Sequence, residues 1–111
     1  MNETLHQCIQ ECVNCHGICL NTITYCLEHG GRHAEGGHIR LLTDCAEICQ
    51  TSANFMLRGS SLHARTCAVC ADICAQCAED CEQFKDDAHM QRCAEACRRC
   101  AESCRKMAAH G

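Results

Sequence analysis

Sixteen cysteines among 111 residues are the side chains of this sequence best suited to chemistry. They fall into four groups, and successive cysteines within a group are separated by 3, 4 or 7 residues. Such spacing keeps side chains on one face of an α-helix, along a heptad seam. The groups are Cys8, Cys12, Cys15, Cys19 and Cys26; Cys45 and Cys49; Cys67, Cys70, Cys74, Cys77 and Cys81; and Cys93, Cys97, Cys100 and Cys104.

Rows of thiols in one register predict a site for soft metal ions, because thiolate sulfur selects Cu(I), zinc or iron–sulfur clusters. Zinc sites usually close at four ligands on knuckles or at element ends, unlike continuous helical rows. Iron–sulfur proteins use compact runs such as C-x2-C-x2-C-x3-C-P, and this sequence contains no proline. Cu(I) accepts two or three sulfur ligands, so thiols one helical turn apart can share an ion. The candidate pairs are Cys8/Cys12, Cys15/Cys19, Cys45/Cys49, Cys70/Cys74, Cys77/Cys81, Cys93/Cys97 and Cys100/Cys104.

Other uses of the cysteines compete with Cu(I) binding. Inert thiols in this number would pack poorly, and disulfides require an oxidising compartment. A zinc or mixed-metal thiolate buffer of the metallothionein type is the alternative binding function. A thiol redox enzyme is the alternative from another class, and Cys67-x2-Cys70 comes nearest to the helix N-terminus that such motifs prefer. The sequence favours metal binding without catalysis.

Charge and hydropathy exclude several further classes. The 10 basic and 14 acidic residues give a net charge of −4, which provides no polycationic surface for nucleic acid. No apolar run approaches the ~20 residues needed to cross a bilayer, so no membrane association is expected. Residues 1–20 show neither a basic n-region nor an uninterrupted apolar h-region of a secretory signal. The sequence therefore predicts a reducing, cytoplasmic location.

The cysteine rows require helices to align them, and four rows close into one bundle. The predicted fold class is all-α, an antiparallel up-down four-helix bundle with a Cys-lined core, forming one domain over residues 1–111. A Gly-rich loop at 29–37, a Gly-Ser-Ser turn at 59–61 offering Ser N-caps, and Asp N-caps at 86–87 separate the helices. The helices are predicted at about 3–28, 38–57, 61–84 and 87–108.

The two ends of this bundle are predicted to differ. One end, beside the Gly-rich loop, is the predicted mouth for metal, with candidate residues His29, His38, His89 and Met90. His33, within the loop, is interpreted as a solvated residue. The opposite end is predicted to be an apolar plug of Leu5, Phe55, Met56, Leu57, Leu62 and Met107. Candidate ligands on the inward register at that far end are Met56, His63 and Met107.

A second apolar stripe follows the first cysteine row by one position. In the first helix it comprises Ile9, Val13, Leu20, Ile23 and Leu27. In the second helix, residues recurring at sevens are Leu41, Ile48 and Phe55. Packing between the first two helices explains this stripe, and so does contact between subunits; both can hold at once.

The rows Cys8-x3-Cys12-x2-Cys15-x3-Cys19 and Cys93-x3-Cys97-x2-Cys100-x3-Cys104, with the similar row at 67–81, resemble those of the bacterial four-helix-bundle copper storage proteins. The resemblance covers essentially the whole chain and is greatest to the cytosolic branch of that family. It implies a homotetramer of bundles. Each bundle holds many Cu(I) ions, for copper storage and detoxification. A copper chaperone, as donor or acceptor of metal, is the candidate protein partner.

Helix two departs from the family pattern. Ser52 and Met56 occupy register positions where cysteines are expected, which predicts a lower capacity at that end. We therefore expect the store to be asymmetric, densest from the middle of the bundle toward the His-rich mouth.

Overall fold

Local residues set where each helix begins and ends. The computed structural model describes residues 2–110, in the order α1 (Glu3–His29), the 3-10 turn η1 (Gly31–Ala34), α2 (Gly36–Leu57), α3 (His63–Glu82) and α4 (Ala88–His110). α1 begins because the Asn2 side chain accepts a hydrogen bond from the Leu5 backbone N–H at 2.7 Å. It ends at Gly30, whose φ of 76° lies in the region that glycine adopts without steric cost.

Two helix starts differ from the expected positions by two residues. α2 begins early, at Gly36, because the Glu35 carbonyl already accepts the Ile39 N–H at 3.0 Å. α3 begins late, at His63, because Ser60 does not cap it. The Ser60 hydroxyl instead accepts the Leu62 N–H at 3.1 Å and forms a turn before the helix.

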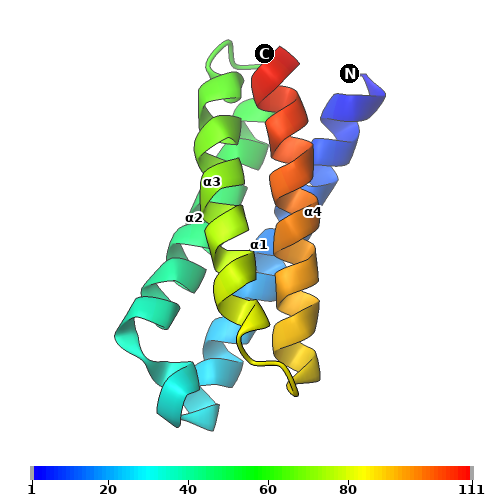
Figure 1. The fold of residues 1–111 in the computed structure, drawn as a ribbon. Helices are drawn as coiled ribbons and strands as arrows, with labels where there is room; N and C mark the ends of the chain where they lie inside the picture. Colours follow the sequence, from blue (N-terminus) through cyan, green and yellow to red (C-terminus); the bar gives the residue numbers. More distant parts are fainter. Residues whose placement is uncertain (1, 111) are drawn as a thin grey trace.

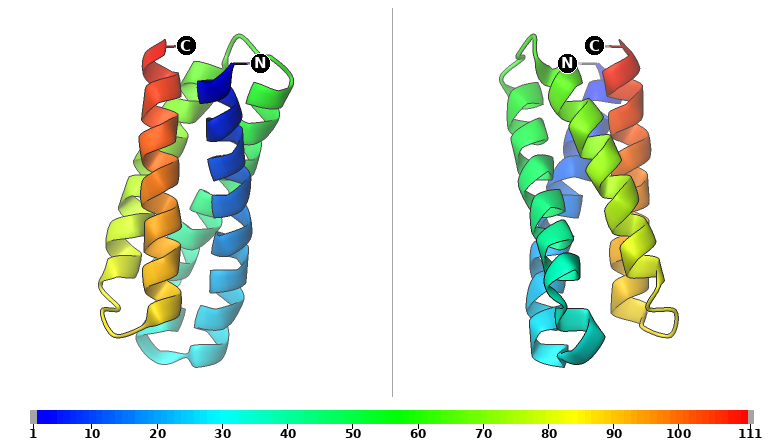
Figure 2. Two further views of the ribbon diagram at one scale, coloured as in Figure 1. Left: turned by 90° about the vertical axis from the view of Figure 1, so that its right-hand side faces the viewer. Right: turned by 60° about the vertical axis from the view of Figure 1, so that its left-hand side comes forward.

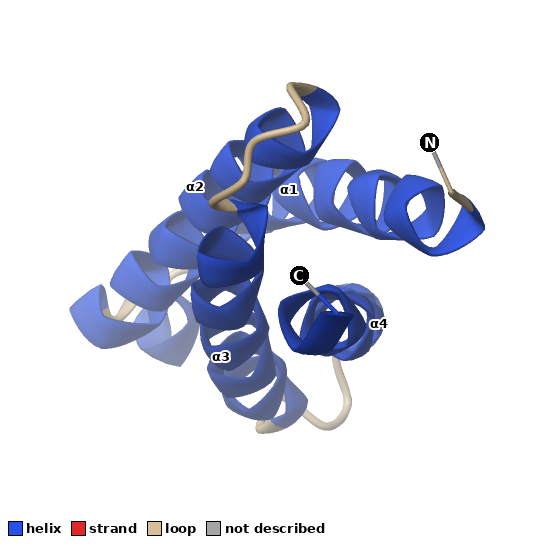
Figure 3. Cartoon of the chain, turned by 90° about the horizontal axis from the view of Figure 1, so that it is seen from above, coloured by secondary structure: helices blue, strands red, loops and turns tan. Residues whose placement is uncertain are grey.

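The helices form an antiparallel up-down bundle measuring 42 × 19 × 17 Å, as predicted (Figure 1). Each helix packs against two others: α1 contacts α2 and α4, and α3 also contacts α2 and α4. Viewed from above, the four helices surround a common axis (Figure 3). The α1–α2 and α3–α4 connections lie at one end, which we call the mouth, and the termini lie with the α2–α3 connection at the far end (Figure 2).

Small side chains fill most of the bundle interior. The cysteines are joined there by buried alanines, which recur at sevens on α3 (Ala71, Ala78) and α4 (Ala94, Ala101). Such small residues permit close approach of the helices. The large side chains that are fully buried are few: Leu42, Met56 and Met90. Among the described residues, none of the helices combines the length and the apolar character needed to cross a membrane.

Because the core has few large apolar groups, Leu42 should carry an unusual share of the stability of the metal-free protein. Leu42→Ala should lower the free energy of unfolding by about 2–5 kcal/mol, the range for a fully buried Leu. The matched control is Leu57→Ala, since Leu57 is 57% exposed and should cost under ~1 kcal/mol. Chemical denaturation of the reduced, metal-free protein measures both. Equal losses in the two variants would contradict this assignment of the core.

Candidate metal centre

All sixteen cysteines are free thiols with 0% exposure. Their Sγ atoms gather into groups of three or four that lie within 4.8 Å of one another. The groups are Cys12, Cys70, Cys100 and Cys104; Cys15, Cys49, Cys74 and Cys100; Cys15, Cys19, Cys45 and Cys97; and Cys8, Cys67 and Cys104. Each group therefore presents several sulfur ligands to a soft cation.

The shortest sulfur contacts join different helices. The Sγ atoms of Cys12 on α1 and Cys104 on α4 are 3.5 Å apart, and those of Cys45 on α2 and Cys74 on α3 are 3.6 Å apart. Two of the pairs predicted along single helices also come close, at 3.9 and 3.8 Å: Cys15/Cys19 and Cys70/Cys74. A metal ion in this core is therefore offered ligands from several helices, and not only from successive turns of one.

The sulfur groups occupy the middle and the far end of the bundle, which corrects the expectation of a store densest toward the mouth. The cysteines outside these groups all lie in the mouth half: Cys26, Cys77, Cys81 and Cys93. The physical reason is that other inward positions there are taken by Thr22 and Leu42, both with 0% exposure. At the far end, Ser52 occupies an inward position where a cysteine was expected, and the thiols around it still form sulfur groups.

Burial helps to keep the thiols of Cys26 and Cys67 protonated in the metal-free protein. Desolvation, followed by the negative charges of neighbouring groups, raises the pKa of Cys26 to about 11. For Cys67, hydrogen bonding with Cys104 lowers the pKa, but Cys8 and burial outweigh it and raise the pKa to about 11. Metal ions bind the thiolate form, so each ion that enters must displace protons.

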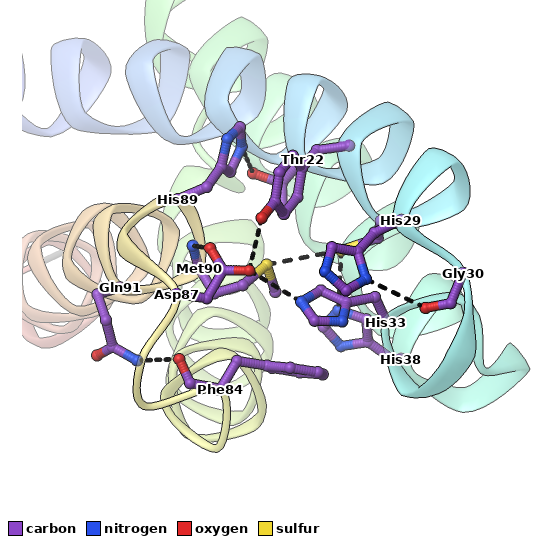
Figure 4. Close-up of polar contacts among 12 residues, drawn as sticks. Thr22, His29, Gly30, His33, His38, Phe84, Asp87, His89, Met90 and Gln91 are labelled. Carbon is purple, nitrogen blue, oxygen red and sulfur yellow. Dashed lines mark hydrogen bonds and ion pairs between the residues drawn. The ribbon is translucent and has the colours of Figure 1, made fainter.

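The innermost layer of the mouth combines sulfur and nitrogen. His38 is only 6% exposed, and its Nε2 lies 3.4 Å from Cys26 Sγ. The thioether Sδ of Met90 lies 3.6 Å from the same Cys26 Sγ (Figure 4). On its other side, His38 Nδ1 pairs with the Asp80 carboxylate, which fixes the orientation of the ring. The role of Asp80 was not predicted from the sequence, although this residue directly precedes Cys81 and so lies beside the thiol core.

The outer layer of the mouth is built from nitrogen and oxygen donors. His33 is not solvated as interpreted from the sequence, because its Nε2 lies 3.0 Å from Asp87 Oδ2. The Tyr25 hydroxyl donates to the same carboxylate oxygen at 2.6 Å. His29 stacks on His33 with ring centroids 3.7 Å apart, whereas His89 turns toward α1 and stacks on Tyr25 at 4.2 Å (Figure 4). These rings line a cavity of about 720 Å³.

Asp87 joins the two connections at the mouth. Its Oδ1 accepts the Met90 backbone N–H at 3.2 Å and so caps α4, while Oδ2 faces Tyr25 and His33. Burial acts to raise the pKa of Asp87, but hydrogen bonds from Tyr25, His33 and Met90 outweigh it and lower the pKa to about 2. The sequence indicated Asp87 as a helix cap but not as a neighbour of these side chains.

The far end differs in part from the predicted apolar plug. Met56 and Met107 are buried, at 2% and 6% exposure, and Met56 Sδ lies 3.8 Å from Cys67 Sγ. Leu57, at the end of α2, and Leu62, directly before α3, are instead about half exposed. The His63 ring pairs through Nδ1 with the Ser60 carbonyl at 2.9 Å, within that turn.

The fold and the site together define a class of protein, a helix bundle whose interior is a continuous reservoir of sulfur ligands for soft metal ions. The sequence profile of the Csp family, the copper storage proteins, matches residues 1–109. The chain belongs to this family, which confirms the resemblance seen in its cysteine rows.

Known structures agree over nearly the full length. A protein from Nitrosospira multiformis is 49% identical, with a TM-score of 0.94 and complete coverage of both chains. The Cu(I)-bound copper storage protein BsCsp3, which is also known in its metal-free form from Bacillus subtilis, is 40% identical, with a TM-score of 0.88 over 96% of this chain and 99% of its own. A cytosolic copper storage protein from Streptomyces lividans carrying five coppers is 29% identical, with a TM-score of 0.84 over 96% and 93%.

The raised thiol pKa values predict that the metal-free protein loses stability in alkali. The ordinary thiol value is 9.0, and a folded pKa near 11 stabilises the fold fully below pH 9 and progressively less as pH rises through 11. Denaturant unfolding of the reduced protein should show this loss between about pH 8 and about pH 11. Cys26→Ala removes one such group and should reduce the loss. A stability that stays constant across this range would contradict the raised pKa values.

Proposed function

We propose that this protein stores Cu(I) ions on the thiolates of its core and so also protects against excess copper. The observation that carries the proposal is the gathering of buried thiols from all four helices into sulfur groups without solvent access. Membership of the copper storage family supports it. So does the relative from Streptomyces lividans, which has been solved with five coppers and after loading with 10 copper equivalents.

The arrangement of the sulfurs favours Cu(I) over zinc. Three thiols, Cys15, Cys100 and Cys104, each belong to two sulfur groups, so neighbouring groups share ligands. Zinc prefers closed tetrahedral sites with four ligands of their own. Cu(I) is softer and needs only two or three sulfurs, so a chain of shared thiolates can hold closely spaced ions.

Storage also fits this site better than thiol redox catalysis. A reactive cysteine needs a depressed pKa and access to its partner. Here Cys67 and Cys70, the pair nearest to a helix start, have 0% exposure, so neither thiol is accessible to a redox partner. The protein is therefore proposed to act by binding and not as an enzyme.

The same relatives and the exposed surface of α1 support proposals for the location and assembly of the protein. The Streptomyces lividans relative is described as cytosolic, and we place this chain in the cytoplasm as well, where a copper chaperone is the proposed donor or acceptor. Val13, Leu20 and Leu27 recur at sevens along α1 and remain 47–56% exposed. Of the two predicted uses of the apolar stripe, this exposure favours contact between subunits in a homotetramer.

Metal is proposed to enter the core at the mouth. Cys26 is the outermost thiol of α1, and it touches both His38 and Met90, whose nitrogen and thioether sulfur can transfer Cu(I) to it by ligand exchange. His29 lies further out and is exposed, at the start of this route. His89 has a supporting role, since its Nε2 faces the Thr22 hydroxyl at 3.2 Å and not the thiols.

The number of bound ions tests the proposed function. If each Cu(I) uses two thiolates, sixteen thiols hold about eight ions, and shared thiolates allow more. Zinc bound at one ion per sulfur group would reach only about four ions per chain. Native mass spectrometry of the reduced protein, before and after anaerobic addition of each metal, counts ions and subunits together.

Two variants sharpen this count. Cys45→Ala with Cys49→Ala removes both thiols of α2 and should lower the Cu(I) count, whereas Ser52→Ala should leave it unchanged. About four tightly bound zinc ions with no tight Cu(I) uptake would replace copper storage by zinc buffering.

The rate of loading tests the mouth. His38→Ala combined with Met90→Ala should slow Cu(I) uptake and removal by about tenfold, the size typical of losing support for a metal site. His63→Ala, at the far end, is the matched control and should load at the rate of the unchanged protein. Stopped-flow absorbance in the Cu(I)–thiolate band follows both. Equal rates in the double variant and the unchanged protein would show that metal does not enter the core through His38 and Met90.

A further inference from the structure

The outer layer of the mouth has a donor set that differs from the thiol core. We propose that His29, His33 and Asp87 form a separate site for a divalent cation of borderline softness, with Zn(II) as the best fit. One ligand atom from each of these residues lies within 4.8 Å of the other two. The three come from the end of α1, from η1 and from the residue that caps α4.

The distances suit a small tetrahedral ion. His33 Nε2 and Asp87 Oδ2 are 3.0 Å apart, close to the ~3.3 Å that separates two ligands on tetrahedral zinc with bonds of about 2.0–2.1 Å. His29 lies against His33 with a ring angle of 27° and is exposed, so its ring is free to turn toward the same point. Two imidazoles, one carboxylate and a water complete four-coordination.

The surroundings already orient two of the three ligands. The Tyr25 hydroxyl holds Asp87 Oδ2 at 2.6 Å, and the Phe84 ring packs on His33 with centroids 4.2 Å apart. His29 Nδ1 faces the Gly30 carbonyl at 3.5 Å, which leaves Nε2 for a metal. Such supporting contacts fix tautomer and ring orientation at metal sites. Arg32 and Lys85 also line the cavity and repel cations, so we expect moderate affinity.

A cation at this site would tie together the two connections that border the mouth. It would join η1 and the end of α1 to the start of α4, at the end of the bundle that also holds His38 and Met90 (Figure 4). In this position it should slow the passage of metal to and from the thiols. This consequence rests on the proposed copper store, whereas binding of the divalent ion does not.

The binding test uses Cu(I)-filled protein, whose thiols are already ligated, with Co(II) and Zn(II) as probes. We expect one divalent ion per chain, with a Co(II) spectrum that lacks sulfur-to-cobalt charge transfer. His33→Ala and Asp87→Asn should abolish binding, and Tyr25→Phe should weaken it by about tenfold through loss of support. His6→Ala is the control, because His6 is an exposed histidine near the start of α1, and it should bind normally. Absence of a bound ion, sulfur charge transfer, or unchanged binding in His33→Ala would each overturn the proposal.

Two further readouts separate this proposal from the copper store. In the metal-free reduced protein, side-chain nitrogen NMR should show Zn(II) shifting His29 and His33, and shifts confined to other histidines would overturn the site. In Cu(I)-filled protein, Zn(II) should slow copper removal by a chelator, and His33→Ala should abolish that effect. A protein that fails to take up Cu(I) but shows the NMR shifts would refute the store while supporting the divalent site.

Discussion

The central constraint on this protein is that thiols occupy the space in which a helix bundle normally places branched apolar side chains. All sixteen have 0% exposure, while in the part of the chain that the structure describes the large apolar side chains that are fully buried are Leu42, Met56 and Met90. The helices therefore approach closely, with buried alanines on α3 and α4. Since Cys and Ala bury less apolar area than Leu, the metal-free bundle gains less hydrophobic stabilisation than usual. Cations bound only by the folded state would add to that stability.

The same constraint makes the ends of the bundle different. At the far end the α2–α3 turn and two buried methionines cover the outermost sulfurs, and Ser52 Oγ contacts Cys67 Sγ at 3.3 Å in place of a thiol. At the mouth, titratable side chains from two connections meet, and the cavity opens among them. The paired imidazole and carboxylate groups of His33 with Asp87 and of His38 with Asp80 lie at the mouth. The proposed route into the core therefore rests on a difference in side-chain chemistry between the two ends of the bundle.

Ligand softness increases from solvent to core. The outermost layer offers nitrogen and oxygen from His29, His33 and Asp87. The next layer mixes nitrogen with thioether and thiol sulfur, at His38, Met90 and Cys26. Beyond these the candidate ligands are thiols as far as the thioether of Met56 at the far end. Because soft ions prefer sulfur and borderline ions accept imidazole and carboxylate, the proposed outer site and the thiol core would favour different metals.

The sequence by itself determined the helices, their number and which face of each turns inward, because a row of cysteines at 3, 4 and 7 is a local property of a helix. It also indicated His38 and Met90, which lie on that register. The tertiary structure alone decided which thiols meet, since facing helices bring Cys12 to Cys104 across 92 positions of sequence. It likewise decided the pairing of His33 with Asp87, because each residue lies in a connection between helices, where the sequence has no periodicity. Contacts of this kind depend on how the helices are staggered relative to one another, and no local sequence pattern specifies that stagger.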